Sequence, residues 1–117
     1  MHNFKELIVW KKARQLVKEV YLLTKQFPKE EIFCLTQQIR RAVISIPSNI
    51  AEGAGRNSKA DYAHFLDIAN GSAFEVETQL CLSFDLEYIN ALEFENINNK
   101  IIEIQKMIYK LRDFLKS

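Results

Sequence analysis

The polar side chains best placed for chemistry lie near the middle of the chain, around Pro47. Arg41, Ser48, Asn49 and Glu52 occur there at spacings that put them on one stripe of a helix. A guanidinium, a hydroxyl, a carboxamide and a carboxylate can form a small active site if they share a concave pocket that perturbs the carboxylate. A structural role for this stripe is the favoured interpretation.

Other arrangements that carry catalysis or hold metals are incomplete. The chain has two histidines, His2 and His64, and Asp61 stands three residues before His64. A di-iron bundle needs two Glu-x-x-His pairs and two further carboxylates, and the sequence offers no second pair. Residues 53–55 (GAG) match neither a dinucleotide-binding nor a phosphate-binding loop. We therefore expect no metal, no cofactor and no enzymatic activity.

The composition is that of one folded domain over residues 1–117. Hydrophobic residues make up 48% of the chain and charged residues 26%, with three glycines and two prolines, which argues against a disordered tail or a Gly/Pro-rich β-protein. Cys34 and Cys81 form no CxxC motif, so we expect two buried apolar side chains in an intracellular protein. The lack of a visible membrane span or signal peptide favours the cytoplasm and no membrane partner.

Hydrophobic residues recur at helical spacing, and no segment alternates with the period of a strand. Four helices are predicted, over residues 7–26, 28–54, 58–88 and from 90 to near the end. Ser58 with Asp61, and Asn90 with Glu93, resemble capping boxes at the starts of the third and fourth helices. Short connections between long helices predict an all-α, antiparallel up-down four-helix bundle.

The second predicted helix is apolar over about 200° of its circumference, whereas an outer helix of a monomeric bundle needs little more than about 100°. Exposing the excess would leave an apolar patch of a kind that monomers rarely carry. The simplest cover is a second copy of the chain, so we expect a homo-oligomer. The alternative is that this helix is more central than its neighbours and is covered within the chain.

Two residues interrupt this apolar surface. Arg40 lies inside it, so its guanidinium must be paired or hydrogen-bonded if it is buried. Glu75 and Glu77 are the expected partners, and the alternative is a side chain that extends along the surface to solvent. Pro47 removes one backbone donor and crowds the carbonyl of Val43, which predicts a single helix that is kinked at Pro47.

A patch of small residues interrupts the third predicted helix. Gly71, Ser72 and Ala73 are adjacent, and a glycine inside a helix costs about 1 kcal/mol relative to alanine. The patch therefore predicts a site at which another helix packs closely.

Charge is divided between the two halves of the chain. Residues 1–56 carry 10 Lys and Arg against 5 Asp and Glu, a net charge of +5, whereas residues 57–117 carry 6 against 10, a net charge of −4. The halves can attract each other within the bundle, or the first half can present a basic face to nucleic acid or an acidic partner. The residues of this basic face would be Lys5, Lys11, Lys12, Arg14, Lys18 and Lys25.

Two runs in the second predicted helix carry a resemblance to a known family. Residues 38–42 (QIRRA) and 45–56 (SIPSNIAEGAGR) are similar to the signature of the 23S rRNA intervening-sequence protein family, also called four helix bundle proteins. Supporting matches are residues 7–13 (LIVWKKA), Val20-Tyr21, Phe27-Pro28, Phe65-Leu66, Ala69, Gly71-Ser72 and Glu75. The resemblance covers nearly the whole chain, and its central motif is long and specific.

The resemblance implies an antiparallel four-helix bundle that assembles as a homopentameric ring and has no established enzymatic activity. Genes of the family were first noticed within insertions in bacterial 23S rRNA genes, and many lie elsewhere. A related group, the accessory proteins of diversity-generating retroelements, forms similar pentamers with a basic surface that bind a reverse transcriptase and nucleic acid. The residues that match polar positions of the family motifs, expected as a polar cluster and oligomer contacts, are Arg40, Arg41, Ser48, Asn49, Glu52, Arg56 and Glu75.

The chain departs from the family pattern at three positions. Cys34 stands where a small residue is expected, Asn70 where Arg is common, and Glu87 where Gly is common. The loss of a cation at residue 70 and the gain of an acid at residue 87 weaken the argument for strong nucleic-acid binding.

Three functional hypotheses follow. The first is a non-enzymatic homo-oligomeric scaffold or adaptor whose basic helices contact RNA or a protein that handles nucleic acid. The second is a small enzyme that uses the polar stripe near Pro47. The third is a purely structural assembly without a polyanionic partner. Binding to nucleic acid should weaken steeply with salt, because phosphate contacts release counterions.

Overall fold

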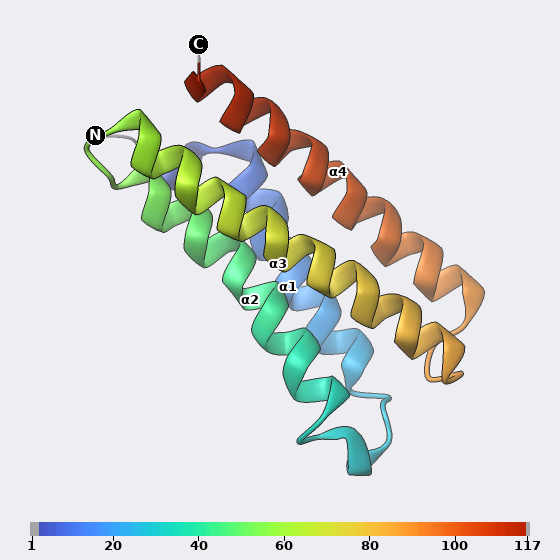
Figure 1. The fold of residues 1–117 in the computed structure, drawn as a ribbon. Helices are drawn as coiled ribbons and strands as arrows, with labels where there is room; N and C mark the ends of the chain where they lie inside the picture. The colour runs from blue at the N-terminus through green and yellow to red at the C-terminus, as the bar shows by residue number, and fades with distance from the viewer. Residues whose placement is uncertain (1–2, 117) are drawn as a thin grey trace.

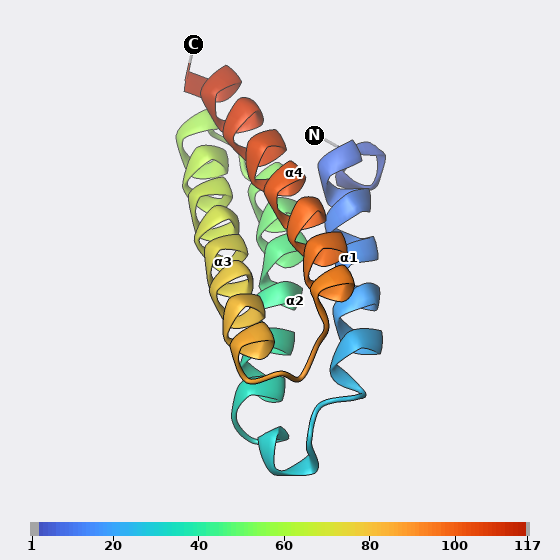
Figure 2. The same cartoon turned by 90° about the vertical axis from the view of Figure 1, so that its right-hand side faces the viewer.

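The computed structural model describes residues 3–116 and folds them into four long helices (Figure 1). Their bounds are α1 (Ile8–Thr24), α2 (Leu35–Ala54), α3 (Lys59–Asp85) and α4 (Ala91–Lys116), with two short 3-10 helices, η1 (Phe4–Glu6) and η2 (Lys29–Glu31). Each helix packs against the next along the chain, and α4 returns to α1 (Figure 2). The molecule measures 44 × 24 × 20 Å. The predicted all-α antiparallel four-helix bundle is confirmed.

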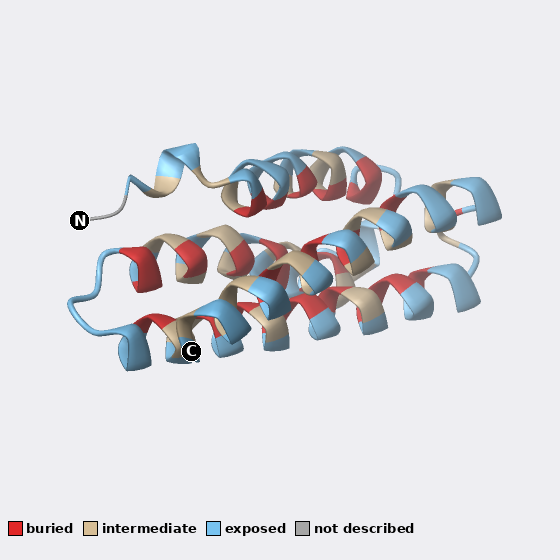
Figure 3. Cartoon of the chain, turned by 90° about the horizontal axis from the view of Figure 1, so that it is seen from above, coloured by how far each residue is buried: buried red, intermediate tan, exposed pale blue. Residues whose placement is uncertain are grey.

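The core is an apolar interior to which all four helices contribute, so that the buried residues of each face inward (Figure 3). The members from α4 recur at alternating steps of four and three residues: Ile97, Ile101, Ile104 and Ile108. Leu111 and Leu115 continue this seam and are partly buried against the core. The spacing of these residues is what aligns α4 with the bundle axis.

Most of the wide apolar surface of α2 is covered within the chain. α2 packs against both α1 and α3, and Ile39, Val43, Ile46 and Ile50 are completely buried. Ile44 remains 42% exposed. A helix with neighbours on two sides buries more than a single stripe, so the inference that this surface requires a second copy as its cover is wrong. The alternative, that the chain itself covers this surface, holds for these residues, but α2 is not more central than its neighbours, because α3 also packs between two helices.

The helix that was expected to begin at Pro28 begins instead at Leu35. Pro28 precedes the short helix η2, and the chain then turns, with φ −122° and ψ −106° at Cys34. The carboxylate of Glu31 accepts hydrogen bonds from the backbone N–H of Leu35 (3.3 Å) and from the hydroxyl of Tyr88 (2.7 Å). The carboxylate therefore serves a backbone donor at the start of α2, and its hydrogen bond raises the pKa of Tyr88.

Both predicted helix starts carry side-chain caps. The hydroxyl of Ser58 accepts a hydrogen bond from the backbone N–H of Asp61 at 3.1 Å. At α4 the exchange is reciprocal: the Asn90 side chain accepts from the N–H of Glu93 (2.8 Å), and the Glu93 carboxylate accepts from the N–H of Asn90 (2.9 Å). These bonds satisfy donors that lack a partner in the first turn of a helix.

α2 runs through Pro47 as one helix, as the sequence predicts. The Ser48 hydroxyl donates to the carbonyl of Ile44 (2.9 Å), and the Asn49 carboxamide donates to the carbonyl of Ser45 (2.8 Å). These carbonyls follow directly after the one that Pro47 leaves without a backbone donor. The kink at Pro47 stays a prediction.

The two cysteines are exposed, so the prediction of two buried apolar side chains is wrong. Cys34 lies in the turn before α2. Cys81 follows the buried Leu80 in α3, and successive residues of a helix point in different directions. Among the helices within residues 3–116, none combines the length and the apolar character needed to cross a membrane.

Candidate functional site

Basic residues of α1, together with Lys25 at its C-cap, form an exposed row on the outer face of the helix. Lys11, Arg14, Lys18 and Lys25 are exposed, and their steps of three, four and seven residues place them on one side of the helix. Within residues 3–116, none of the four pairs with a carboxylate. We call these four residues the basic stripe. Lys5, in η1, is exposed as well.

Lys12, also expected on this face, points elsewhere. Its Nζ lies 3.0 Å from the Glu103 carboxylate, and Lys100 pairs with Glu19, so both pairs join α1 to α4. Exposed pairs of this kind contribute at most about 1 kcal/mol. Of these two pairs, only Lys12–Glu103 joins a cation of the basic half to an anion of the acidic half, since Lys100–Glu19 has the opposite sense. Lys12 is not a member of the basic stripe.

An apolar groove of about 390 Å³ runs between α1 and α2, beside the basic stripe. We call it the Trp10 groove. The Phe4 ring meets the Trp10 ring edge-on, with 5.2 Å between centroids, and the guanidinium carbon of Arg14 lies 5.5 Å from the Trp10 ring centroid. The other residues that line the groove are Val17, Ile44, Pro47, Ser48 and Ala51.

The cations of this surface are predictable from the sequence, whereas its aromatic residues were not predicted as part of a binding surface. Trp10 and Arg14 are four residues apart, which puts both on one face of α1. This spacing alone could have predicted that an aromatic ring lies beside the cations. Phe4 reaches the groove only because η1 packs on α1 and α2, and Ile44 reaches it because α2 packs beside α1. Neither packing can be read from local spacing.

The four polar residues around Pro47 do not meet in one pocket. Arg41 lines a cleft between α2 and α3, whereas Ser48 lines the Trp10 groove between α1 and α2. Asn49 hydrogen-bonds within its own helix, and Glu52 is exposed at the surface. The small active site that these residues could form is therefore not assembled in the structure.

Arg56 links the end of α2 to α3. Its guanidinium lies 3.6 Å from the Glu52 carboxylate and its central carbon lies 4.6 Å from the centroid of the Phe65 ring. Both contacts are structural, since they hold the connection between two neighbouring helices. His64 lies on α3 beside Phe65. His2 lies outside the residues that the structure describes.

Arg40 is held by α1 and not by a carboxylate. Its Nε donates to the hydroxyl of Thr24 (2.8 Å), one terminal nitrogen donates to the carbonyl of Tyr21 (3.5 Å), and the guanidinium carbon lies 4.6 Å from the Tyr21 ring centroid. Pairing with Glu75 or Glu77 is a wrong prediction, because those residues belong to α3 and Arg40 faces α1. The expectation of a hydrogen-bonded guanidinium is confirmed.

The outer face of α3 exposes apolar side chains next to an open glycine. Phe74 is 54% exposed, and Ile68 and Leu82 are also exposed. A Cβ placed on Gly71 would meet nothing within 4 Å. The small-residue patch therefore packs only in part within residues 3–116: Ser72 and Ala73 are buried, with Ser72 hydrogen-bonded to Ser45 of α2, while no helix covers Gly71.

Comparison with known proteins now decides the family. A model of the family described as 23S rRNA-intervening sequence protein matches residues 5–110. The chain belongs to this family. A similar solved structure is that of a protein of unknown function from the S23 ribosomal protein family of Bacteroides thetaiotaomicron VPI-5482, which is 32% identical, with a TM-score of 0.84 and coverage of 90% of this chain and 98% of that one. Among curated proteins, none matches the chain.

In this chain, the motif that carries the resemblance to the family forms most of α2. Its apolar members Ile39, Ile46 and Ile50 fill the core, and Gly53 lies against α3. Its polar members are spread over the Trp10 groove, the cleft between α2 and α3, and the end of α2. The motif is therefore first a packing signature, and a binding function must be sought on the surfaces beside it.

Proposed function

We propose that this chain is a cytoplasmic, non-enzymatic member of its family that assembles with copies of itself and binds RNA as a scaffold or adaptor. The assembly is a homopentamer, in keeping with the resemblance described above. The observation that carries the proposal is the basic stripe: four exposed cations pair with no carboxylate of residues 3–116, and one of them, Arg14, lines the groove that holds Trp10.

The combination of charge and aromatic surface favours single-stranded RNA as the partner. Lysines and arginines release counterions when they contact phosphates, which supplies affinity without sequence specificity. Aromatic side chains in a basic groove allow bases to stack, and this stacking is largely independent of base identity. Trp10 and Phe4 supply such rings within the Trp10 groove, and Arg14 belongs to both the groove and the basic stripe.

Self-assembly is supported by the outer face of α3. The exposed Phe74 and the open Gly71 lie within one turn of each other on this helix, and a glycine inside a helix is unfavourable unless another backbone approaches it. A helix of a second copy on this face would cover the apolar side chains. α1 and α3 do not contact each other in the bundle, so the two proposed surfaces lie on different helices.

Fluorescence anisotropy of a labelled single-stranded RNA, titrated over a series of salt concentrations, tests the RNA proposal. The logarithm of the binding constant is expected to fall linearly with the logarithm of salt concentration. The double variant Lys11→Gln/Lys18→Gln should flatten this slope by about 0.7 for each phosphate that the variant no longer neutralises. The control, Lys106→Gln/Lys110→Gln, removes two exposed lysines from α4. It should leave the salt dependence of RNA binding unchanged.

Quenching of Trp10, the single tryptophan of the chain, provides an independent readout. RNA bound beside the basic stripe should quench its fluorescence, because bases then stack on or near the ring. A lack of binding at low salt, or a flat salt response, would remove RNA from the proposal. A retained assembly would then leave the purely structural role.

A further inference from the structure

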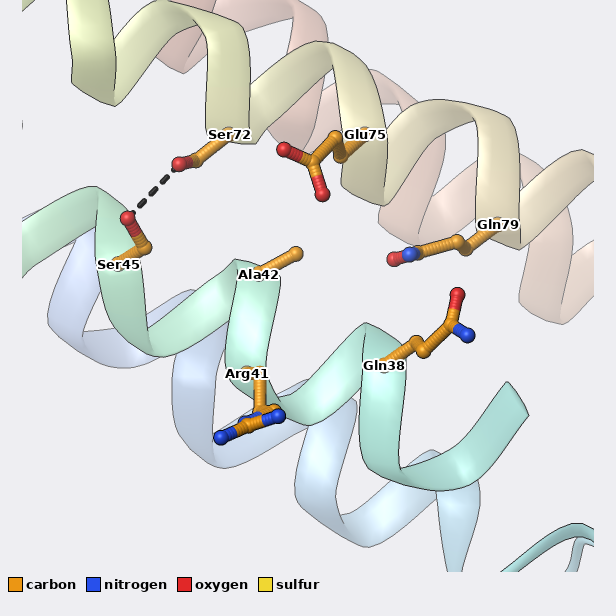
Figure 4. A pocket seen from close by; sticks show the side chains of 7 residues that line it. All are labelled: Gln38, Arg41, Ala42, Ser45, Ser72, Glu75 and Gln79. Atoms are coloured by element: carbon orange, nitrogen blue, oxygen red, sulfur yellow. Dashed lines mark hydrogen bonds between the residues drawn. The ribbon is translucent and has the colours of Figure 1, made fainter. Parts of the chain in front are cut away.

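A polar cleft of about 280 Å³ lies between α2 and α3 (Figure 4), at the edge of the outer face of α3 that carries Gly71 and Phe74. Ala42 is the one apolar residue in its lining. The polar residues that line it are Gln38, Arg41, Ser45, Ser72, Glu75 and Gln79. An interface with another protein has an apolar centre, so this lining favours a small polar ligand.

Gln79 is the residue that marks the cleft as a binding site. Its side chain is 8% exposed, and its Oε1 is buried without a hydrogen-bond partner among the described residues. Figure 4 shows this carboxamide turned into the cleft, toward Gln38. A buried acceptor without a donor is unfavourable and needs a physical explanation. A ligand that donates a hydrogen bond would supply the missing partner.

Glu75 adds a negative charge at the same place. Its carboxylate points into the cleft (Figure 4), and it takes part in none of the ion pairs of residues 3–116. Ser45 and Ser72 close one end of the cleft, where their hydroxyls hydrogen-bond to each other at 2.8 Å. The free acceptors therefore gather around Glu75 and Gln79.

We propose that this cleft binds a small molecule through a guanidinium or primary ammonium group. Such a group donates several hydrogen bonds and carries the charge that Glu75 requires, so it can satisfy the carboxylate and the Gln79 oxygen together. A divalent metal fits less well, because the cleft offers one carboxylate and hard cations prefer more oxygen ligands. Arg41 also lines the cleft, but its guanidinium points away from Glu75 and α3 (Figure 4), so the proposal rests on Glu75 and Gln79.

Isothermal titration calorimetry on the full chain, in its solution assembly, tests the proposal with three matched probes. L-Arginine has the guanidinium and a carboxylate, agmatine has the guanidinium alone, and L-citrulline replaces the guanidinium by a neutral urea. We expect saturable binding of both L-arginine and agmatine, and binding that is at least about tenfold weaker for L-citrulline.

Variants place the ligand in the cleft. Glu75→Gln removes the charge and Gln79→Met removes the acceptor at similar size, and each should weaken L-arginine binding by about tenfold or more. Glu95→Gln, at an exposed position of α4, should leave it unchanged, and circular dichroism checks that each variant is folded. The proposal is overturned if neither L-arginine nor agmatine binds at millimolar concentrations, or if Glu75→Gln and Gln79→Met bind L-arginine as the parent chain does.

Discussion

At the scale of single residues, Gly53 shows how closely two helices of the bundle approach. A Cβ on Gly53 would lie 2.9 Å from the Cβ of Phe65 and 3.1 Å from the backbone oxygen of Tyr62. Both atoms are fixed to the backbone of α3 and cannot rotate away. We therefore predict that Gly53→Ala lowers the free energy of unfolding by about 1–3 kcal/mol, although alanine favours the helix. Urea denaturation measures this change.

Gly55→Ala is the matched control, two residues along the chain. The nearest atoms to a Cβ at Gly55 are 3.6 and 3.8 Å away, and its φ of −85° suits any residue. Alanine there should leave stability unchanged or raise it by a few tenths of a kcal/mol to about 1 kcal/mol. Equal stabilities of the two variants would show that α2 and α3 can separate at Gly53, against this account.

Predictions about single residues were confirmed where they depended on the chemistry of the side chain alone. They were wrong where they depended on which helix packs against the residue. That Arg40 must find hydrogen-bond partners follows from the unfavourable burial of a charge, and it does find them. That its partners are Thr24 and Tyr21 depends on which helix faces it, which one sequence does not determine. The same holds for Cys81, whose exposure follows from its angle on α3.

At the scale of elements, the end of α3 holds a strained residue. The N–H of Tyr88 donates to the carbonyl of Ser83 (2.9 Å) and the N–H of Glu87 donates to that of Phe84 (3.0 Å), which is a Schellman motif. Glu87 occupies its left-handed position, with φ 64°. Glycine adopts this conformation without a steric penalty, and this explains why the family pattern has Gly at this position.

Glu87→Gly is therefore expected to raise the free energy of unfolding by about 1 kcal/mol, because the left-handed backbone is no longer strained. Thermal unfolding followed by circular dichroism measures the gain. Glu95→Gly, which places glycine inside α4, should lower stability by about 1 kcal/mol instead. A loss of stability in Glu87→Gly would contradict the strain assigned to this turn.

Helices were predictable from sequence because periodicity and capping are local. The starts of α3 and α4 were found through Ser58 and Asn90, whose caps involve residues three positions away. The start of α2 was missed, because the turn before it is held by the hydrogen bond between Glu31 and Tyr88, which are 57 residues apart. Pro28 suits the start of a helix in any chain and could not reveal this contact.

At the scale of the whole molecule, two of the proposed binding surfaces, the Trp10 groove and the cleft between α2 and α3, are each formed by a pair of helices. The cations of the basic stripe could be predicted from composition and spacing within α1. The Trp10 groove and the cleft between α2 and α3 could not, since each requires knowledge of which helix faces lie side by side. Because α1 and α3 do not contact each other, the surfaces proposed for RNA binding and for self-assembly lie on different helices.

The central claim is that copies of the chain cover the exposed face of α3. Phe74 lies on this face and outside the core, so Phe74→Glu should disrupt assembly while the bundle stays folded. Tyr109→Glu is the control, because Tyr109 is an exposed aromatic residue on α4. Circular dichroism establishes that both variants remain helical.

The most direct measurement is the mass in solution by light scattering coupled to size-exclusion chromatography. We predict a mass several times the 13.7 kDa of one chain, and five times this value for the pentamer. The mass measured for Phe74→Glu should be that of a single chain, and the mass measured for Tyr109→Glu should be that of the assembly. A parent chain that is folded and remains at 13.7 kDa at micromolar concentrations contradicts the claim.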